Sequence, residues 1–364
     1  MFEAPFYIRR KPLVHWAAAL AAKDITLGFI GGSITDQRSR EHWAEKTVYE
    51  LCAIHPDVSF HIVNAAVGAT NSLHALFRAE QDLIGQGCDV IFVEFAVNDL
   101  AMPAVQRRRV REGLVRKLLH ESCDLVFVYT YERSMLDDLM AARLPESVAE
   151  FEDIAAHYGI PGVFMANYAL DCVKKGRLRY EEWLPDGLHP GHCGSRFYAE
   201  PVLALLNAEL PADPAAGTPP ASALPEPLLA SNYENAHTLP FDRICRKGYW
   251  FEQQPLTLPL IFKTLSSFAP GSSLEFDFEG SGFVIMIDFG NYAADFRFRT
   301  DGGAWQYSDI PQESWIQAGW GVMRYTAVED LARDSHHVEL EVCLHQNSGT
   351  MGCNLDICYI GILP

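Results

Sequence analysis

Ser33 stands where an α/β protein would carry a nucleophile. It follows an apolar run, residues 25–30, that predicts a buried parallel strand, and two glycines, Gly31 and Gly32, come directly before it. Open α/β sheets bind their ligands just beyond the carboxyl ends of such strands. A serine hydroxyl needs a basic partner to act as a nucleophile at neutral pH. Taken alone, the serine is more typical of an ordinary strand-to-helix turn than of a nucleophile.

A second motif far along the chain supplies the partners that Ser33 lacks. Asp186 and His189 lie three residues apart in a loop that precedes the last predicted helix. His189 is a candidate base for Ser33, and Asp186 can turn back to hold the other ring nitrogen. Without Ser33, the same two residues would be an ordinary turn former and a loop histidine. The three together predict nucleophilic catalysis.

Gly68 and Asn98 occupy corresponding places after the second and third predicted strands. Because parallel strands end at one edge of the sheet, both residues are expected near Ser33. The backbone N–H groups of Ser33 and Gly68 and the side-chain amide of Asn98 are candidate donors to a developing oxyanion. Separately, Gly68 fits a turn, and Asn98 with Asp99 fits a helix cap.

Short apolar runs alternate with amphipathic stretches across the first half of the chain. This alternation is typical of βαβ units and predicts a five-stranded parallel sheet with helices on both faces. The predicted strands are 25–30, 58–64, 90–95, 125–131 and 162–166, and the predicted helices are 47–54, 72–84, 105–120, 146–158 and 194–206.

These motifs resemble those of the SGNH hydrolases, or GDSL esterases, whose four sequence blocks are named for Ser, Gly, Asn and His. Ser33, Gly68, Asn98 and His189 stand in the family's order over about the first 208 residues. The resemblance implies a flavodoxin-like three-layer α/β sandwich. It also implies a catalytic set of Ser33, Asp186 and His189, an oxyanion hole of Ser33, Gly68 and Asn98, and no metal or cofactor.

The chain departs from the family pattern at two places. Gly32 stands where the family commonly has Asp, and Ala96 stands where it commonly has Gly. Neither residue transfers a proton in the expected reaction. The departures therefore bear on turn geometry and substrate preference more than on the reaction.

Other polar and aromatic residues near these motifs have more than one interpretation. Glu94, inside the third apolar strand, is expected to be hydrogen-bonded and structural, because an unpaired buried carboxylate is unfavourable. Trp43 and Asn71 either line the pocket or serve packing and turn formation. His192 and Cys193 raise a metal site as a competing hypothesis, although no second ligand cluster is evident.

The second half of the chain has a different sequence pattern. Residues 1–210 form the predicted hydrolase domain, and 211–229, rich in Pro and Ala, form a predicted linker. Period-two alternation at 273–279 and 338–342 predicts an all-β sandwich over 230–364. Most of its aromatic side chains are expected in the core, with a minority exposed and able to stack on sugar rings. Those considered are Tyr249, Trp250, Trp305, Tyr307, Trp315 and Trp320.

Charge and cysteine content limit the partners and the compartment. The formal charge of −18 argues against nucleic acid or an anionic membrane as partner. The arginines at 107–109, 111 and 116 are expected on a solvated helix face. Nine cysteines without metal-like pairing indicate a reducing, cytoplasmic setting. Residues 13–20 are expected to form a helix, and secretion is the alternative if residues 1–22 act as a signal peptide.

The sequence thus predicts a serine esterase acting on short acyl esters, acetyl esters in particular, of a small molecule or an oligosaccharide. Two alternatives stay open. One is a carbohydrate-binding protein with a non-catalytic hydrolase-like domain, and the other is an acyltransferase with the same site. Acyl chain length, the alcohol part of the ester and the oligomeric state are not indicated.

Overall fold

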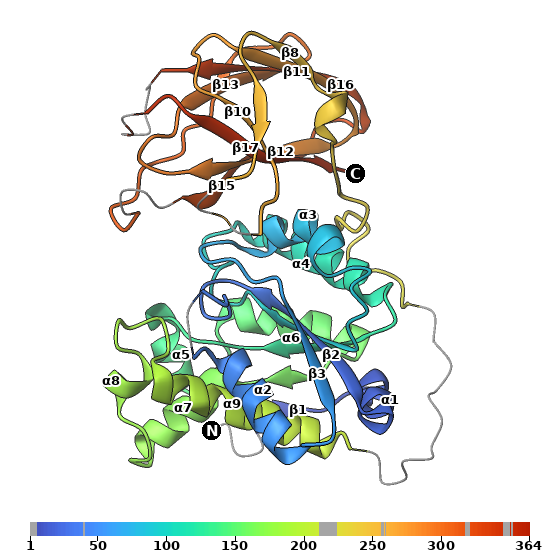
Figure 1. Ribbon diagram of the computed structural model, residues 1–364, viewed down its shortest axis with the longest axis vertical. Coiled ribbons are helices and arrows are strands. Elements are labelled where there is room, and N and C mark those ends of the chain that lie inside the picture. Colours follow the sequence, from blue (N-terminus) through green and yellow to red (C-terminus); the bar gives the residue numbers. More distant parts are fainter. Residues whose placement is uncertain are drawn as a thin grey trace. The chain divides into compact units, whose positions relative to one another are not determined.

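Two compact units, Met1–Glu234 and Asn235–Pro364, make up the chain in a computed structural model (Figure 1). The structure describes residues 6–38, 41–210, 224–255, 258, 260–316, 321–344, 350 and 352–364. Most of the predicted linker, 211–223, lies outside the described residues. The residues after it belong to the first unit: Arg116 donates to the carbonyl oxygen of Pro225 at 2.8 Å, and the N–H of Leu229 donates to Glu112 at 2.8 Å.

A six-stranded sheet forms the centre of the first unit. Its order is β1-β6-β5-β4-β2-β3, and the pairs from β6 to β3 are all parallel, whereas β1 runs antiparallel to β6. The five parallel strands of the prediction are confirmed, and the short β1 was not predicted. The strands are β1 (Tyr7–Ile8), β2 (Asp24–Gly31), β3 (Ser59–Asn64), β4 (Val90–Glu94), β5 (Asp124–Val128) and β6 (Gly162–Val163).

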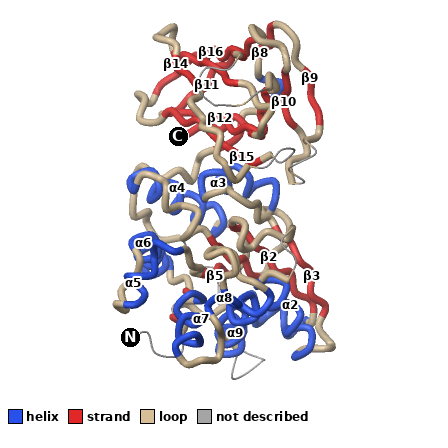
Figure 2. The backbone as a smooth tube through the Cα atoms, turned by 90° about the vertical axis from the view of Figure 1, so that its left-hand side faces the viewer, coloured by secondary structure: helices blue, strands red, loops and turns tan. Residues whose placement is uncertain are grey.

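Helices cover both faces of this sheet, which gives three layers (Figure 2). Alternate strand residues such as Leu27 and Phe92 join a buried cluster with α1, α2, α7 and α9. On the other face, Phe127 of β5 packs edge-on against Phe151 of α6, and α3 and α4 share that side (Figure 1). The helices are α1 (Val14–Ala22), α2 (Trp43–Ile54), α3 (Ser72–Asp82), α4 (Ala104–Leu119), α5 (Leu136–Met140), α6 (Glu146–Tyr158), α7 (Met165–Lys174), α8 (Tyr180–Trp183) and α9 (His192–Ala208), with a 3₁₀ turn at Arg133–Met135.

The last predicted strand is shorter than expected. The apolar run at 162–166 pairs with β5 only through Gly162 and Val163, and α7 begins at Met165. Both the short strand and the start of α7 are buried. Their apolar residues therefore show no periodicity that would distinguish the strand from the beginning of the helix. The predicted N-terminal helix is present as α1, and its Trp16 is buried in the core.

Three of the five arginines on α4 contradict the expectation of a solvated face, whereas Arg108 is exposed as expected. Arg107, Arg111 and Arg116 are buried. Arg111 lies between the carboxylates of Asp99, at 2.7 Å, and Glu150, at 3.3 Å. Burial of these guanidinium groups is possible because each meets a carboxylate inside the protein. Those partners come from distant parts of the chain, so the local sequence pattern did not show them.

Two antiparallel sheets form the second unit, as predicted. One has the order β15-β12-β17-β10-β9 with β7 also on β17, and the other has the order β14-β13-β16-β11-β8. Phe283 of the first sheet contacts Phe276, Phe278 and Phe298 of the second, so the core lies between the sheets. The strands are β7 (His237–Thr238), β8 (Cys245–Lys247), β9 (Phe251–Gln253), β10 (Thr264–Ser267), β11 (Ser273–Gly280), β12 (Gly282–Phe289), β13 (Asp295–Thr300), β14 (Gln306–Tyr307), β15 (Val322–Val328), β16 (Asp334–Cys343) and β17 (Leu355–Leu363), with a 3₁₀ turn at Phe241–Arg243.

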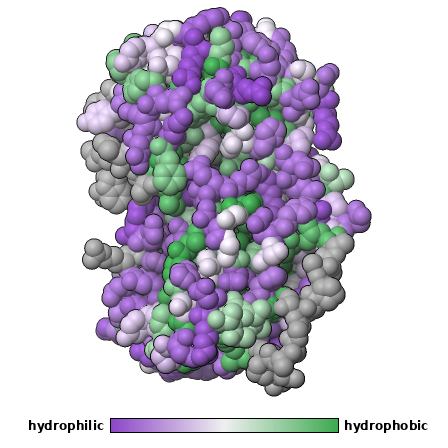
Figure 3. All heavy atoms as spheres, turned by 45° about the vertical axis from the view of Figure 1, so that its right-hand side comes forward, coloured by the Kyte–Doolittle hydropathy of each residue, from purple (hydrophilic) through white to green (hydrophobic). Residues whose placement is uncertain are grey.

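The helices, the surface and the cysteines add three observations. Among the described residues, no helix is long and apolar enough to cross a membrane. On the face shown in Figure 3, hydrophilic residues predominate and hydrophobic ones form small areas. All nine cysteines are free thiols.

Candidate active site

The turn after β2 places Ser33 at the carboxyl edge of the sheet. The backbone N–H groups of Thr35 and Asp36 both donate to the carbonyl oxygen of Gly32, which closes a helical turn around Ser33. Gly31 must lack a side chain here, because a Cβ on it would lie 2.9 Å from the carbonyl oxygen of Glu94. The close approach of β2 to β4 therefore requires the glycine that precedes the turn.

The loop with Asp186 and His189 is held by its own hydrogen bonds. Oδ1 of Asp186 accepts from the backbone N–H groups of Leu188, at 2.9 Å, and His189, at 2.7 Å. Gly187 has φ +83°, a conformation that favours glycine. The Asp-Gly-x-His sequence thus folds locally into a turn that brings the carboxylate back to the imidazole.

Ser33, His189 and Asp186 form one hydrogen-bonded chain. Oγ of Ser33 lies 2.7 Å from Nε2 of His189, and Nδ1 of His189 lies 2.7 Å from Oδ2 of Asp186. Burial alone would raise the pKa of Asp186, but hydrogen bonds from the His189 side chain and from the loop N–H groups outweigh it and hold the pKa below its usual value. The structure therefore brings together all three residues predicted from the sequence.

Asn98 lies directly over Gly32. A Cβ on Gly32 would be 2.2 Å from Oδ1 of Asn98 and 2.5 Å from its Nδ2. The amide makes no hydrogen bond within the described part of the chain, and α4 begins only after Pro103, so Asn98 does not cap it. Asp99 accepts instead from the backbone N–H of Ser72, the first residue of α3, at 2.8 Å. The Asn98 amide is therefore available beside Ser33, the candidate nucleophile.

Gly68 has a partner that the sequence analysis did not anticipate. Its backbone N–H, a predicted oxyanion donor, donates to Oδ2 of Asp36 at 2.7 Å. Asp36 is also bound by the guanidinium of Arg38. Neither residue was singled out from the sequence, since no local pattern shows that the turn after β2 reaches the loop after β3.

Comparison with known proteins gives a fold likeness over almost the whole chain. The sequence matches no family model and no curated protein. A crystal structure of a two-domain esterase (CEX) active on acetylated mannans superposes with a TM-score of 0.79 at 21% identity, covering 98% of this chain and 96% of that one. Its co-crystal structure with mannopentaose gives a TM-score of 0.79 at 20% identity, with the same coverage. The chain has the fold of a two-domain esterase.

The other residues considered around the candidate site have structural contacts. Glu94 accepts from Thr130 at 2.7 Å and from Thr35 at 3.1 Å, as the sequence analysis expected of a buried carboxylate. Trp43 is fully buried and donates to Thr35. Asn71 caps α3 with its side chain. Packing and capping therefore account for Trp43 and Asn71.

His192 and Cys193, the basis of the competing metal hypothesis, begin α9. Nδ1 of His192 lies 2.8 Å from a carboxylate oxygen of Glu41. Within the described residues, no group of three His, Cys, Asp or Glu side chains could hold a metal ion. His192 thus joins the turn region after β2 to the start of α9.

The aromatic residues of the second unit correct one expectation. Phenylalanines fill the sandwich core, whereas none of the five described Tyr and Trp residues considered from the sequence is buried. Trp305 lies against the guanidinium groups of Arg297 and Arg299, whose Cζ atoms are 4.5 and 4.7 Å from its ring. Trp320 lies outside the described residues. Hydroxyl and indole groups favour partly wet positions, which explains the separation from the Phe core.

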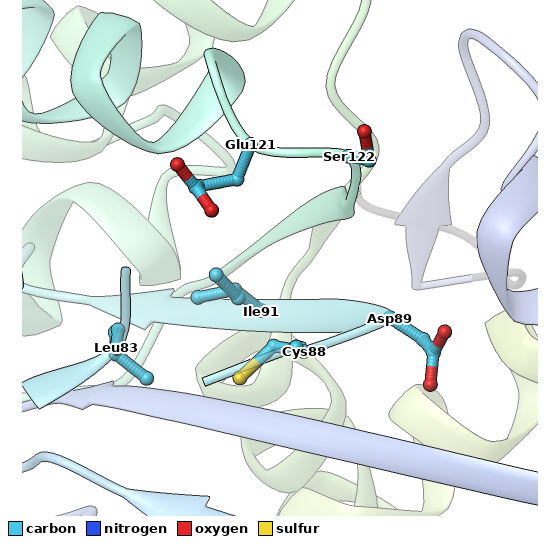
Figure 4. A pocket seen from close by; sticks show the side chains of 7 residues that line it. Leu83, Cys88, Asp89, Ile91, Glu121 and Ser122 are labelled. Atoms are coloured by element: carbon cyan, nitrogen blue, oxygen red, sulfur yellow. The ribbon is translucent and has the colours of Figure 1, made fainter. Parts of the chain in front are cut away.

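A cavity of about 200 Å³ lies at the opposite end of the strands from Ser33. Cys88, Asp89 and Ile91 at the start of β4, and Glu121 and Ser122 before β5, line it (Figure 4). Burial raises the pKa of the Cys88 thiol to about 11, so this sulfur is not a thiolate at neutral pH. None of the predicted site residues lines this cavity.

Proposed function

We propose that the chain is a serine esterase that removes short acyl groups, acetyl in particular, from carbohydrate. The observation that carries the proposal is the continuous hydrogen-bonded chain from Asp186 through His189 to Ser33. A nucleophile, a base within hydrogen-bond reach and a third group that orients the base are the parts that acyl transfer requires. No cofactor has a role in this chemistry.

In the proposed reaction, Oγ of Ser33 attacks the ester carbonyl carbon while Nε2 of His189 takes the hydroxyl proton. His189 then gives that proton to the alcohol oxygen as the C–O bond breaks, which leaves an acyl-enzyme. Water attacks the acyl carbon with His189 again as the base, and the carboxylic acid leaves as Ser33 is restored. Asp186 stays ionised because its pKa is low, and it stabilises the imidazolium formed in each half-reaction.

Negative charge develops on the carbonyl oxygen in both tetrahedral intermediates. The proposed donors to it are the backbone N–H of Ser33 and Nδ2 of Asn98, whose position over Gly32 brings the amide next to the nucleophile. Donors fixed in advance need no reorganisation during the reaction, which makes this the largest single contribution in many enzymes. The third predicted donor, the N–H of Gly68, is bound to Asp36 in this structure.

The proposed substrate class rests on the fold and on the activity described for the structural neighbour. The two-domain esterase with the same architecture is described as active on acetylated mannans, and it has been co-crystallised with mannopentaose. Exposed Tyr and Trp side chains on the all-β unit of this chain offer flat apolar surfaces that suit sugar rings. Acetylated oligosaccharides are therefore the first substrates to test.

The test measures acetate release from acetylated manno- and xylo-oligosaccharides, and p-nitrophenol release from p-nitrophenyl acetate, butyrate and octanoate. We expect turnover with preference for acetate, and a loss of at least about 1,000-fold in kcat for Ser33→Ala and His189→Ala. Full activity of Ser33→Ala would refute the mechanism. Glycan binding without any ester turnover would favour the binding-protein alternative, and an acylated acceptor sugar would favour acyl transfer.

A further inference from the structure

Asp36 is a buried carboxylate beside the proposed nucleophile. It lies three residues after Ser33 in the same helical turn, and its side chain is 5% exposed. Its Oδ2 accepts the backbone N–H of Gly68 at 2.7 Å. In this structure, an anionic oxygen therefore binds the same N–H that the sequence analysis assigned to the oxyanion of the reaction.

Arg38 supplies the compensating charge. Its Nε and Nη2 donate to Oδ2 of Asp36 at 2.8 and 2.6 Å, and its backbone N–H donates to Oδ1 at 2.8 Å. Asp36 thus receives three hydrogen bonds from Arg38 and one from Gly68. If the Gly68 bond were given up, the carboxylate would remain bound and neutralised.

The pair lies within reach of the reacting atoms. A Cβ on Gly68 would be 3.1 Å from Nη2 of Arg38, 3.3 Å from Oδ2 of Asp36 and 3.5 Å from Cβ of Ser33. The carboxylate, the guanidinium and the nucleophile therefore surround the same small volume above Gly68. At such separations in a partly buried site, one uncompensated charge changes the energy of a nearby oxyanion substantially.

We propose that Arg38 is a positioning residue that holds Asp36 so that the Gly68 N–H can pass to the oxyanion during the reaction. The inference rests on the proposed esterase function. In the resting site the N–H is bound by Asp36. As the tetrahedral intermediate forms, its oxygen takes the N–H, while Arg38 keeps the carboxylate in place and cancels its charge.

The test is a double-mutant cycle with p-nitrophenyl acetate. Arg38→Ala leaves Asp36 charged and held only by backbone N–H groups, so we expect kcat to fall by about 10-fold or more while KM changes little. Asp36→Asn keeps the size and removes the charge, so its loss of kcat should be clearly smaller than that of Arg38→Ala. The double variant should recover to the same level, and Arg38→Lys should retain most of the activity.

A second measurement separates positioning from a structural role. An alkylboronic acid forms a tetrahedral anion on a serine hydroxyl, so its inhibition constant reports the oxyanion site directly. We expect Arg38→Ala to weaken boronate inhibition about as much as it lowers kcat, and Asp36→Asn in the same chain to restore it. Arg299→Ala, which breaks a two-bond ion pair with Glu339 in the second unit, is the matched control and should alter neither value.

Two results would overturn the inference. If Asp36→Asn alone were as slow as Arg38→Ala and the double variant no better, the pair would only support the fold of the turn. If Arg38→Ala matched wild type in kcat and boronate inhibition, Asp36 would need no counter-charge. Failure of the proposed function itself looks different, because wild-type protein would then neither release p-nitrophenol nor bind the boronate at Ser33.

Discussion

At the scale of single residues, the contact between Asn98 and Gly32 explains one difference between this chain and the SGNH hydrolases that its motifs resemble. Those hydrolases commonly have Asp before the catalytic serine, whereas here even a methyl group before Ser33 would be 2.2 Å from Oδ1 of Asn98. The Asn98 amide therefore occupies the space that a side chain at position 32 would need. The residue at position 32 and the orientation of the Asn98 side chain therefore depend on each other.

This contact predicts that Gly32→Ala acts through Asn98. The added Cβ should push the amide aside and lower kcat toward the loss of about 100- to 1,000-fold expected for Asn98→Ala, the typical effect of removing one oxyanion donor. Initial rates with p-nitrophenyl acetate measure both variants. The double variant should be no slower than Asn98→Ala alone, and independent, multiplying losses would contradict the explanation.

At the scale of elements, the end of β4 supports the turn that carries Ser33. Glu94 is fully buried and accepts hydrogen bonds from Thr35 on the turn and from Thr130 after β5. Burial raises the pKa of Glu94 to about 7, and the hydrogen bonds from Thr130, Thr35 and the Gly32 N–H offset only part of that increase. The carboxyl group thus connects the end of β4 with the turn after β2 and the loop after β5, at the carboxyl edge of the sheet. It carries a proton below neutral pH.

Glu94 should therefore make stability depend on pH. The folded chain keeps a proton that the unfolded chain releases near the ordinary value of 4.5, so the stability contribution of Glu94 is greatest at low pH and falls as pH rises toward about 7. Over that range the difference is roughly 2 to 3 kcal/mol. Urea unfolding of wild type and Glu94→Gln at pH 5, 6, 7 and 8 measures it. A difference between the two proteins that did not change with pH would count against the raised pKa.

A buried ion-pair network joins α4 and α6 to the loop that carries Asn98. Arg111, fully buried, donates to Asp99 at 2.7 Å and to the carbonyl oxygen of Ser147 at 2.8 Å. Asp99 in turn binds the first N–H of α3. The residue next to Asn98 is thus fixed by three helices.

We expect Arg111→Ala to lower the free energy of unfolding by about 3 to 5 kcal/mol, because it leaves the buried Asp99 carboxylate without its counter-charge, whereas Glu150 keeps its ion pair with Arg107. Arg108→Ala on the same helix is the control. Its side chain is 56% exposed, and removing it should change stability by less than about 1 kcal/mol. Denaturant unfolding compares the two, and equal losses would mean that burial does not set the effect.

At the scale of the whole molecule, the features that could be predicted from the sequence are those that depend on a periodic pattern or on a short segment. The parallel strands, the sandwich of the second unit and the Asp186–His189 turn follow from apolar patterns and turn chemistry within short segments. The buried arginines of α4 and the Asp36 contact with Gly68 depend on partners far away in the sequence, which no local pattern contains. That Ser33, His189 and Asp186 lie together was therefore predictable, and the charged groups around them were not.

The two units have separate cores, and all five predicted site residues lie in the first. Phe283→Ala should therefore destabilise the second unit by about 3 to 5 kcal/mol, since it removes a fully buried ring from the sandwich core. Turnover of p-nitrophenyl acetate at a temperature where the variant stays folded should be close to wild type. Calorimetry and initial rates test this, and a large loss of kcat in the folded variant would show that the units are coupled.

The loop with Asp186 and His189 has a consequence for how activity is lost. Its side chains are 56% and 41% exposed, and the turn is closed by its own short-range hydrogen bonds. His189 and Asp186 are therefore held in one local turn, and the bond from His189 to Ser33 joins this turn to a residue 156 positions away in the sequence. Local opening of so exposed a loop requires less free energy than global unfolding. Under gentle heating, the catalytic contact should separate while both hydrophobic cores are still intact.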